Sequence, residues 1–273
     1  MSSRRKSGSN PYKSTMITLF ELGNYLSKLL NYPDGPVEKV DPYMANGLMV
    51  KGKEEIQKIG FGVSASLELF KKAKEENCDC IITHHSFSLP EYNGYDPIFQ
   101  SRMEFLIKNN ISLFGFHFLL DWHPILGNNA QILKKIGAKP KKPYLFYGNP
   151  WGWVGEFGKL KNRDEIEEVL KSFLSPRIIT YHFGENQIRK VVAVSGKGAP
   201  HASEMKDLIK EKIDLYITGE VHEWNRELFR EAKINFIAGG HYHTEVFGLR
   251  ALMEEVKKKF QIEVTWLKLT NDI

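Results

Sequence analysis

The sequence predicts an α/β fold, with mixed sheets flanked by helices and divided between two lobes. Short apolar runs typical of buried strands alternate with amphipathic helical patterns. Histidine and acidic residues recur where these strands end, and α/β sheets collect their ligands at such ends. With 273 residues and 42% hydrophobic content, the chain can bury a large core. We expect one unit from residue 16 to 273, with lobes at 16–137 and 138–273.

Composition argues against a membrane or secreted protein. No apolar run approaches the ~20 residues that a membrane helix needs, and no apolar stretch follows the N-terminal charges as in a signal peptide. The two cysteines, Cys78 and Cys80, are too close together to form a disulfide framework. We therefore predict a cytoplasmic protein in a reducing compartment.

Residues 1–15 predict a flexible basic tail that need not belong to the natural protein. They contain no acid and no apolar periodicity, so they cannot fold alone. Without them the net charge of +5 falls close to neutral, which makes nucleic-acid binding a weak expectation. Lysine clusters at 139–142 and 257–259 could still touch phosphates. The basic residues of the tail are Arg4, Arg5, Lys6 and Lys13.

The first lobe is predicted to begin with a helix and to continue as a strand–helix–strand unit. Leucines at helical spacing indicate a helix over residues 17–30, ended by turn residues at 31–36. Short strands are expected at 46–50 and 58–63, followed by a helix after Ser66. The strand at 80–85 completes the βαβ unit. Residues 90–95 predict a loop, and 98–109 predict a helix.

The strand at residues 80–85 ends in two adjacent histidines, His84 and His85. Neighbouring side chains on a strand point to opposite faces, so the pair cannot easily bind one ion while the chain is extended. Where the strand ends, the two rings can turn toward a shared space, and each can bind a different metal of a pair ~3.5–4 Å apart. The alternative is that these are ordinary cap or surface residues.

The apolar run at residues 111–120 predicts a further strand that places Asp121 at its end. His117 and Asp121 share one face of such a strand but are ~13 Å apart along it. We therefore expect His117 to support the ligands or to face the substrate, rather than to bind the same ion. Asp121 could instead be a turn or helix-cap acid. A helix follows from about residue 128 and ends at Gly137.

The second lobe is predicted to start with an edge strand within residues 139–153 and a helix capped at Asn162. Strands follow at 177–183 and 190–195. The turn after the second of these contains Gly196 and Gly198, whose backbone N–H groups could bind a phosphate. The turn lacks the spacing of known phosphate-binding motifs, so a tight strand-to-helix connection is the stronger interpretation.

Two later strands also end in polar residues. The strand at 214–218 leads to Glu220 and His222, and the strand at 234–238 leads through two glycines to His241, His243 and Glu245. If a helix begins near His241, then His241 and Glu245 lie one turn apart on one face, which suits two ligands of one cluster. Glu245 could instead be a first-turn acid that offsets the helix dipole.

Three imidazoles and two carboxylates at strand ends predict a site for two divalent metal ions. This mixture of ligands suits zinc, iron, manganese or nickel rather than calcium. Five side chains are too few to saturate two ions, which leaves room for water. The predicted ligands are His84, His85, Asp121, His241 and Glu245.

The sequence resembles the Nif-three-like dinuclear metal-centre family, also known as type 2 GTP cyclohydrolase I homologues. The resemblance covers nearly all of residues 16–269 and rests on His117 followed by Asp121 and on motifs at 46–48, 82–85, 196–198, 218–220 and 240–245. It implies an α/β fold, metal binding by the same five ligands, and a homohexameric ring (a trimer of dimers) with inward-facing sites. Ser86 stands where the family usually has proline, and residues 118–120 and 128–129 also depart from its pattern. These departures concern the substrate more than the ligands.

We predict a metal-dependent hydrolase in which a hydroxide between two ions is the nucleophile, because coordination lowers the pKa of water from about 15.7 toward ~7. His243, Glu220 or His222 would move protons. In the cyclohydrolase version, the small-molecule substrate is a purine nucleotide. One alternative is a non-enzymatic ring that acts as a metal-binding regulatory scaffold or binds single-stranded nucleic acid. Another is a structural metal that only holds the strand ends together.

Overall fold

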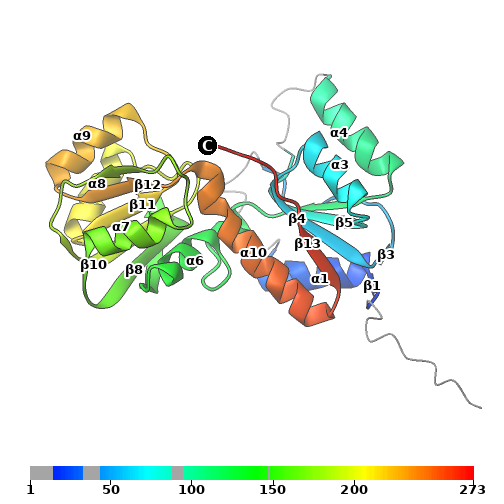
Figure 1. Cartoon of the computed structure of the whole chain (residues 1–273), viewed down its shortest axis with the longest axis horizontal. Helices are drawn as coiled ribbons and strands as arrows, with labels where there is room; N and C mark the ends of the chain where they lie inside the picture. Colours follow the sequence, from blue (N-terminus) through cyan, green and yellow to red (C-terminus); the bar gives the residue numbers. More distant parts are fainter. Residues whose placement is uncertain (1–14, 33–43, 88–94, 147) are drawn as a thin grey trace, which may run out of the picture.

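The computed structural model describes residues 15–32, 44–87, 95–146 and 148–273. Two α/β lobes lie side by side, with the long helix α10 (His241–Phe260) running between them (Figure 1). Its mixed sheets and flanking helices confirm the predicted α/β class. The predicted tail up to residue 14, the turn at 33–36 and most of the loop at 90–95 lie outside the described residues. Among the residues described, we find no helix with the length and apolar character that a bilayer crossing requires.

In the described part of the chain, the first lobe is built on a five-stranded sheet in the order β13-β4-β5-β6-β2. The strands β4, β5 and β6 are parallel, and β2 is antiparallel to β6. Helix α1 starts at a capping box in which Thr18 and Glu21 bond each other's backbone N–H. The elements are β1 (Ile17–Thr18), α1 (Leu19–Leu30), β2 (Gly47–Val50), β3 (Glu55–Ile56), β4 (Lys58–Ser64), α3 (Leu67–Glu75), β5 (Cys80–His85), α4 (Pro97–Lys108), β6 (Ser112–Gly115) and α5 (Phe118–Asp121). Helix α6 (Asn128–Lys135) follows them in the chain but packs in the core of the second lobe.

The second lobe contains, within the described residues, a six-stranded sheet in the order β7-β8-β10-β11-β12-β9. Its centre, β10-β11-β12, is parallel, whereas β8 and β9 join it antiparallel. Asn162 caps α7 as predicted, because its Oδ1 accepts the N–H of Asp164 at 2.7 Å. The elements are β7 (Lys139–Phe146), β8 (Asn149–Asn162), α7 (Arg163–Lys171), β9 (Ile179–Tyr181), β10 (Gln187–Val194), α8 (Ala202–Lys210), β11 (Leu215–Thr218), α9 (Glu223–Ala232) and β12 (Asn235–Ala238).

The last strand corrects the predicted division of the chain. We predicted that residues 138–273 form the second lobe, but β13 (Glu263–Trp266) pairs parallel with β4 in the first sheet. Helix α10 returns the chain to the first lobe. Its apolar face packs into the core of that lobe, where Leu249, Leu252 and Val256 are fully buried. Burying each such side chain contributes roughly 1.5–3 kcal/mol.

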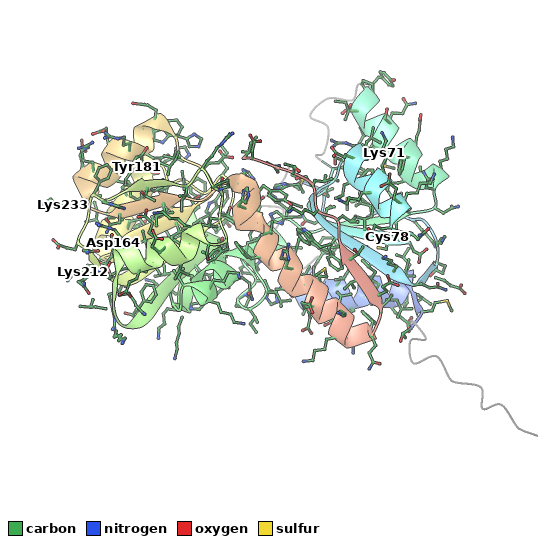
Figure 2. All side chains as sticks on the ribbon, in the orientation of Figure 1. Lys71, Cys78, Asp164, Tyr181, Lys212 and Lys233 are labelled. Carbon is green, nitrogen blue, oxygen red and sulfur yellow. The ribbon has the colours of Figure 1, made fainter. Side chains whose placement is uncertain are left out.

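Helices cover both faces of the five-stranded and the six-stranded sheet. In the first lobe, α1 and α10 pack on one face and α3 and α4 on the other; in the second, α6 and α7 oppose α8 and α9. Figure 2 shows side chains filling the interior of both lobes, with Cys78 labelled in the first and Tyr181 in the second. Cys78 and Cys80 are both buried thiols. Burial raises the pKa of Cys78 to about 12, which makes this thiol unreactive at neutral pH.

The strand predicted at residues 111–120 is wrong in its extent. Strand β6 ends at Gly115, and the chain then makes one helical turn, α5. The N–H of His117 donates to Oδ1 of Asn46 at 2.9 Å instead of to a neighbouring strand, so the sheet stops there. In the helical turn, the N–H of Asp121 bonds the carbonyl of His117, which brings the two side chains close together.

Candidate metal centre

The carboxylate of Glu245 is the point on which the three predicted imidazole ligands converge. Its Oε1 lies 3.6 Å from Nε2 of His84 and 3.2 Å from Nε2 of His241, and its Oε2 lies 3.1 Å from Nε2 of His85. The histidine pair comes from the end of β5, whereas His241 and Glu245 lie one turn apart at the start of α10, as the sequence predicted. Each of the three imidazoles is therefore close enough to Glu245 to share a metal site with it.

The short helix α5 adds Asp121 and His117 to the same place. Oδ2 of Asp121 lies 3.4 Å from Nε2 of His84. The ring of His117 lies 4.8 Å from that of His84 and 5.2 Å from that of His85, between ring centres. Among the described residues, the ligand atoms of His84, His85, His117 and Glu245 all lie within 4.8 Å of one another and could hold a metal ion. We expected a strand that would hold His117 ~13 Å from Asp121. Because β6 ends at Gly115, His117 instead lies beside the ligands.

The outward nitrogens of two histidines are tied to fixed acceptors. Nδ1 of His84 donates to the backbone carbonyl of Phe116 at 3.0 Å, and Nδ1 of His241 donates to the carboxylate of Glu220. Because both acceptors can only accept, each Nδ1 carries a hydrogen, and the lone pair of the neutral ring is on Nε2. Metal-binding histidines are usually oriented in this way, with the far nitrogen bonded to a carbonyl or a carboxylate.

Asp121 and His85 are also held by hydrogen bonds to their outward-facing atoms. Oδ1 of Asp121 accepts bonds from Nδ2 of Asn128 and Oγ of Ser195, both at 2.8 Å, which leaves Oδ2 directed toward the cluster. Nδ1 of His85 lies 3.0 Å from Oγ of Ser64. These supports fix the rotamers of the ligands before any ion binds, and such preorganisation reduces the entropy lost on binding.

Sequence reasoning missed Ser64, Asn128 and Ser195 as supports of the site. The sequence pattern at Asn128 predicts only a helix start, yet this residue is fully buried and its Oδ1 also accepts the N–H of Gly248 at 2.6 Å. A buried amide needs such partners. The long-range contacts that reveal this role have no local pattern in the sequence.

The charge of the cluster favours a bound cation. Nε2 of His84 is buried and, among the described residues, has no hydrogen-bond partner. Burial alone lowers the pKa of His84, but the carboxylates of Asp121 and Glu245 raise it well above its usual value. Burial likewise raises the pKa of Glu245, yet His84 and His85 bring it well below its usual value. Buried carboxylates with an unpaired imidazole nitrogen between them are the donor set that a divalent transition metal prefers.

Gly196 is required beside the cluster. Its backbone is left-handed, with φ of +59°, and a Cβ there would lie 2.1 Å from Oε1 of Glu245. The N–H of Gly196 already donates to Oγ1 of Thr244 at 2.9 Å, so it is not available for the phosphate that the sequence suggested. The carbonyl of Gly198 accepts the hydroxyl of Tyr216 at 2.6 Å. This turn packs tightly against the ligands.

A cavity of about 330 Å³ opens on the cluster. Its volume is at the lower end of the range for small-molecule sites. Besides the cluster residues His85, His117, Asp121, His241 and Glu245, its lining includes Met44, Phe118, Trp151, Val194, Ser195 and Lys197. A small substrate could therefore reach the ligands from this side.

The three predicted proton-transfer residues lie in three different environments. Glu220 bonds Nδ1 of His241. The ring of His222 is stacked on that of Trp224, with centres 4.5 Å apart, in a separate neighbouring cavity. Nδ1 of His243 is buried and lacks a hydrogen-bond partner among the described residues. Of the three, Glu220 contacts the candidate ligands directly.

Comparisons with known proteins support the resemblance. A protein from Archaeoglobus fulgidus named "GTP cyclohydrolase 1 type 2 homolog" is 38% identical over 228 residues, covering 84% of this chain and 90% of that protein. One of the same name from Haemophilus influenzae is 34% identical over 243 residues, covering 86% and 93%.

Solved structures share the whole fold. Protein ybgI, described as of unknown function, superposes with a TM-score of 0.82 at 30% identity, covering 94% of this chain and 100% of that one. TTHA1606 from Thermus thermophilus gives 0.81 at 26% identity, with the same coverage. Residues 24–273 match the family model described as Duf34/NIF3 (NGG1p interacting factor 3). The chain, with its His/Glu cluster at the meeting of two α/β lobes, is therefore a member of the Duf34/NIF3 family.

Proposed function

We propose that this protein is a metal-dependent hydrolase whose site holds two divalent ions. The observation that carries the proposal is the inward convergence of imidazole nitrogens and carboxylate oxygens beside an open cavity, with the outer atoms of His84, His85, Asp121 and His241 anchored by hydrogen bonds. The proposed ligands are His84, His85, Asp121, His241 and Glu245, with His117 as a further ligand or a proton-transfer group on the cavity side.

Bound zinc, iron, manganese or nickel would supply Lewis acidity and lower the pKa of a bound water toward ~7. The protein's part is to hold the donors in place. Glu245 would help to hold the ions with both of its oxygens, because Oε1 faces His84 and His241 and Oε2 faces His85. Glu220 keeps His241 turned inward, and His117 faces the cavity, where it can exchange a proton with a substrate.

The substrate proposed first is a nucleotide. Relatives that match most of this chain are named GTP cyclohydrolase 1 type 2 homologs, so GTP is the first compound to test. Lys197 lines the metal cavity and provides a cation for a phosphate group. Cyclic amides and phosphate esters are the other bonds that metal-activated water commonly cleaves.

The test is metal-dependent turnover by the full-length chain. Chelated protein is reloaded separately with zinc, manganese, iron(II) or nickel, and bound metal is measured by elemental analysis. Hydrolysis of GTP, cyclic amides and phosphate esters is then followed. Glu245→Gln removes the shared carboxylate, and Glu254→Gln, on the exposed face of the same helix, is the matched control.

We expect activity that disappears on chelation, returns with one of the metals, and is lost in Glu245→Gln but kept in Glu254→Gln. Protein that binds metal with a defined stoichiometry but hydrolyses none of these compounds contradicts the enzyme proposal. That result would favour the regulatory or nucleic-acid-binding scaffold. The homohexamer and the cytoplasmic location also remain proposals, and native mass spectrometry tests the first of them.

A further inference from the structure

A second cavity, of about 310 Å³, lies beside the metal cavity and is lined mainly by aromatic rings. The two cavities share Trp151 and Lys197 in their linings. Building on the proposed function, we propose that this aromatic cavity binds the planar heterocyclic ring of a nucleotide while the phosphate ester of the same molecule lies at the metal centre. Because the two cavities share these two residues, one molecule can place its ring in the aromatic cavity and its phosphate at the metal centre.

The rings of the aromatic cavity present flat faces. His222 and His201 lie nearly parallel to Trp224, at interplanar angles of 8° and 14°, and Trp224 is 47% exposed. On the β7–β8 side, Phe146 and Trp151 lie 4.8 Å apart between ring centres. Exposed aromatic faces around a cavity bind planar bases by stacking, because any base offers a π-face. Trp224 belongs to none of the four hydrophobic core clusters of the described residues, so its ring is not part of the packing that holds either lobe together.

Apart from Lys197, which lines both cavities, the polar groups around this cavity argue against phosphate as its occupant. Helices α8 and α9 both begin at the cavity, but the N–H of His201 already donates to Oε2 of Glu204 at 2.8 Å. The N–H of His222 donates to Oδ1 of Asn225 at 3.0 Å. The buried carboxylate of Glu204 also places a negative charge close by. A neutral ring is therefore the better occupant.

The phosphate is better placed on the metal side. Lys197 belongs to both cavities, and it follows Gly196, the residue that is packed directly against Glu245. A phosphate held by Lys197 is thus next to the ligand cluster. This arrangement narrows the proposed reaction to hydrolysis of a nucleoside phosphate ester, without opening of the ring. Water supplies the oxygen that bonds to phosphorus, the bond from phosphorus to the ester oxygen breaks, and a proton from the water ends on the released hydroxyl.

The experiment compares binding of a phosphate ester with and without the ring. Calorimetric titration of the manganese-loaded full-length protein uses GMP, AMP and ribose 5-phosphate in their phosphonate forms, in which a methylene group replaces the ester oxygen, so that hydrolysis cannot remove the ligand during the titration. We expect both nucleotides to bind roughly ten- to a hundredfold more tightly than ribose 5-phosphate, the contribution of one stacked base. Trp224→Ala should reduce this ratio to about threefold or less. Trp266→Ala, on β13 outside both linings, should retain it.

Two results overturn the inference. One is a wild-type ratio of nucleotide to ribose 5-phosphate affinity near unity. The other is a Trp224→Ala variant that weakens ribose 5-phosphate as much as GMP, which would place the phosphate in the aromatic cavity. The proposed function is judged separately, from turnover: ring-dependent binding without hydrolysis of any compound contradicts the enzyme alone, and hydrolysis with no ring dependence contradicts the ring site alone.

Discussion

The sharpest test of the metal centre is to add one methyl group at Gly196. Alanine at position 196 lowers the free energy of unfolding in two ways. The left-handed backbone, with φ of +59°, costs a residue with a Cβ about 1–2 kcal/mol. The new Cβ would also lie 2.1 Å from Oε1 of Glu245 and 3.1 Å from Nε2 of His241, and such overpacking costs typically about 1–3 kcal/mol. We expect Gly196→Ala to lower the free energy of unfolding by roughly 2–5 kcal/mol.

The second cost falls on the ligands themselves. Glu245 is only 2% exposed and faces three imidazoles, so its carboxylate cannot move away without losing those contacts. Loss of a group that positions a metal ligand typically weakens metal binding roughly ten- to hundredfold. We therefore expect Gly196→Ala to weaken metal binding by at least this factor. Competition with a chromogenic chelator measures the affinity, and urea unfolding of the chelated protein measures the stability.

Gly137 provides the matched control. Its φ is +81°, but a Cβ there would have nothing within 4 Å. Gly137→Ala should therefore cost only the backbone strain of about 1–2 kcal/mol and leave the metal affinity unchanged. If Gly196→Ala binds metal as tightly as Gly137→Ala does, then Glu245 is not a ligand held in the position described, and the reasoning fails.

Two further predictions concern carboxylates. Glu220→Gln should weaken metal binding roughly ten- to hundredfold in the chelator competition, because the amide holds Nδ1 of His241 less firmly, whereas Glu223→Gln should not. Burial raises the pKa of Glu167, but Lys171 and other partners lower it below its usual value, so the ionised carboxylate stabilises the fold above about pH 4.5 and loses this effect as pH falls through the lowered value. Glu167→Gln should therefore cost about 1 kcal/mol or less in urea unfolding at pH 7, and less at pH 3 than at pH 7; an equal cost at both pH values would contradict this.

Local patterns in the sequence were enough to predict the ends of β5 and β12. The strand at 80–85 is short, apolar and bounded, and the sequence after 238 changes from strand to helix at two glycines. His84, His85, His241 and Glu245 therefore lie where they were expected. Each of these predictions depended on a few neighbouring residues, which is the range over which periodicity is informative.

The position of His117 could not be predicted in this way. The run 111–120 is continuously apolar, and periodicity alone cannot separate a buried strand from a strand followed by a helical turn. The strand ends because the side chain of Asn46, 71 residues away along the chain, accepts the hydrogen bond from the N–H of His117. The return of β13 to the first sheet likewise depends on packing between distant segments.

The supports of the ligands also explain why two lobes meet at this point. Asp121 follows the first sheet, yet its Oδ1 is held by Ser195, which follows β10 of the second sheet. Asn128 holds the other side of the same carboxylate and accepts the N–H of Gly248 from α10, the helix that joins the lobes. Because a buried carboxylate is costly unless it is paired, these contacts stabilise the arrangement, and a cation bound at the site would stabilise the same arrangement. The candidate metal centre is thus also the junction of the lobes, and metal binding and packing of the two sheets should depend on each other.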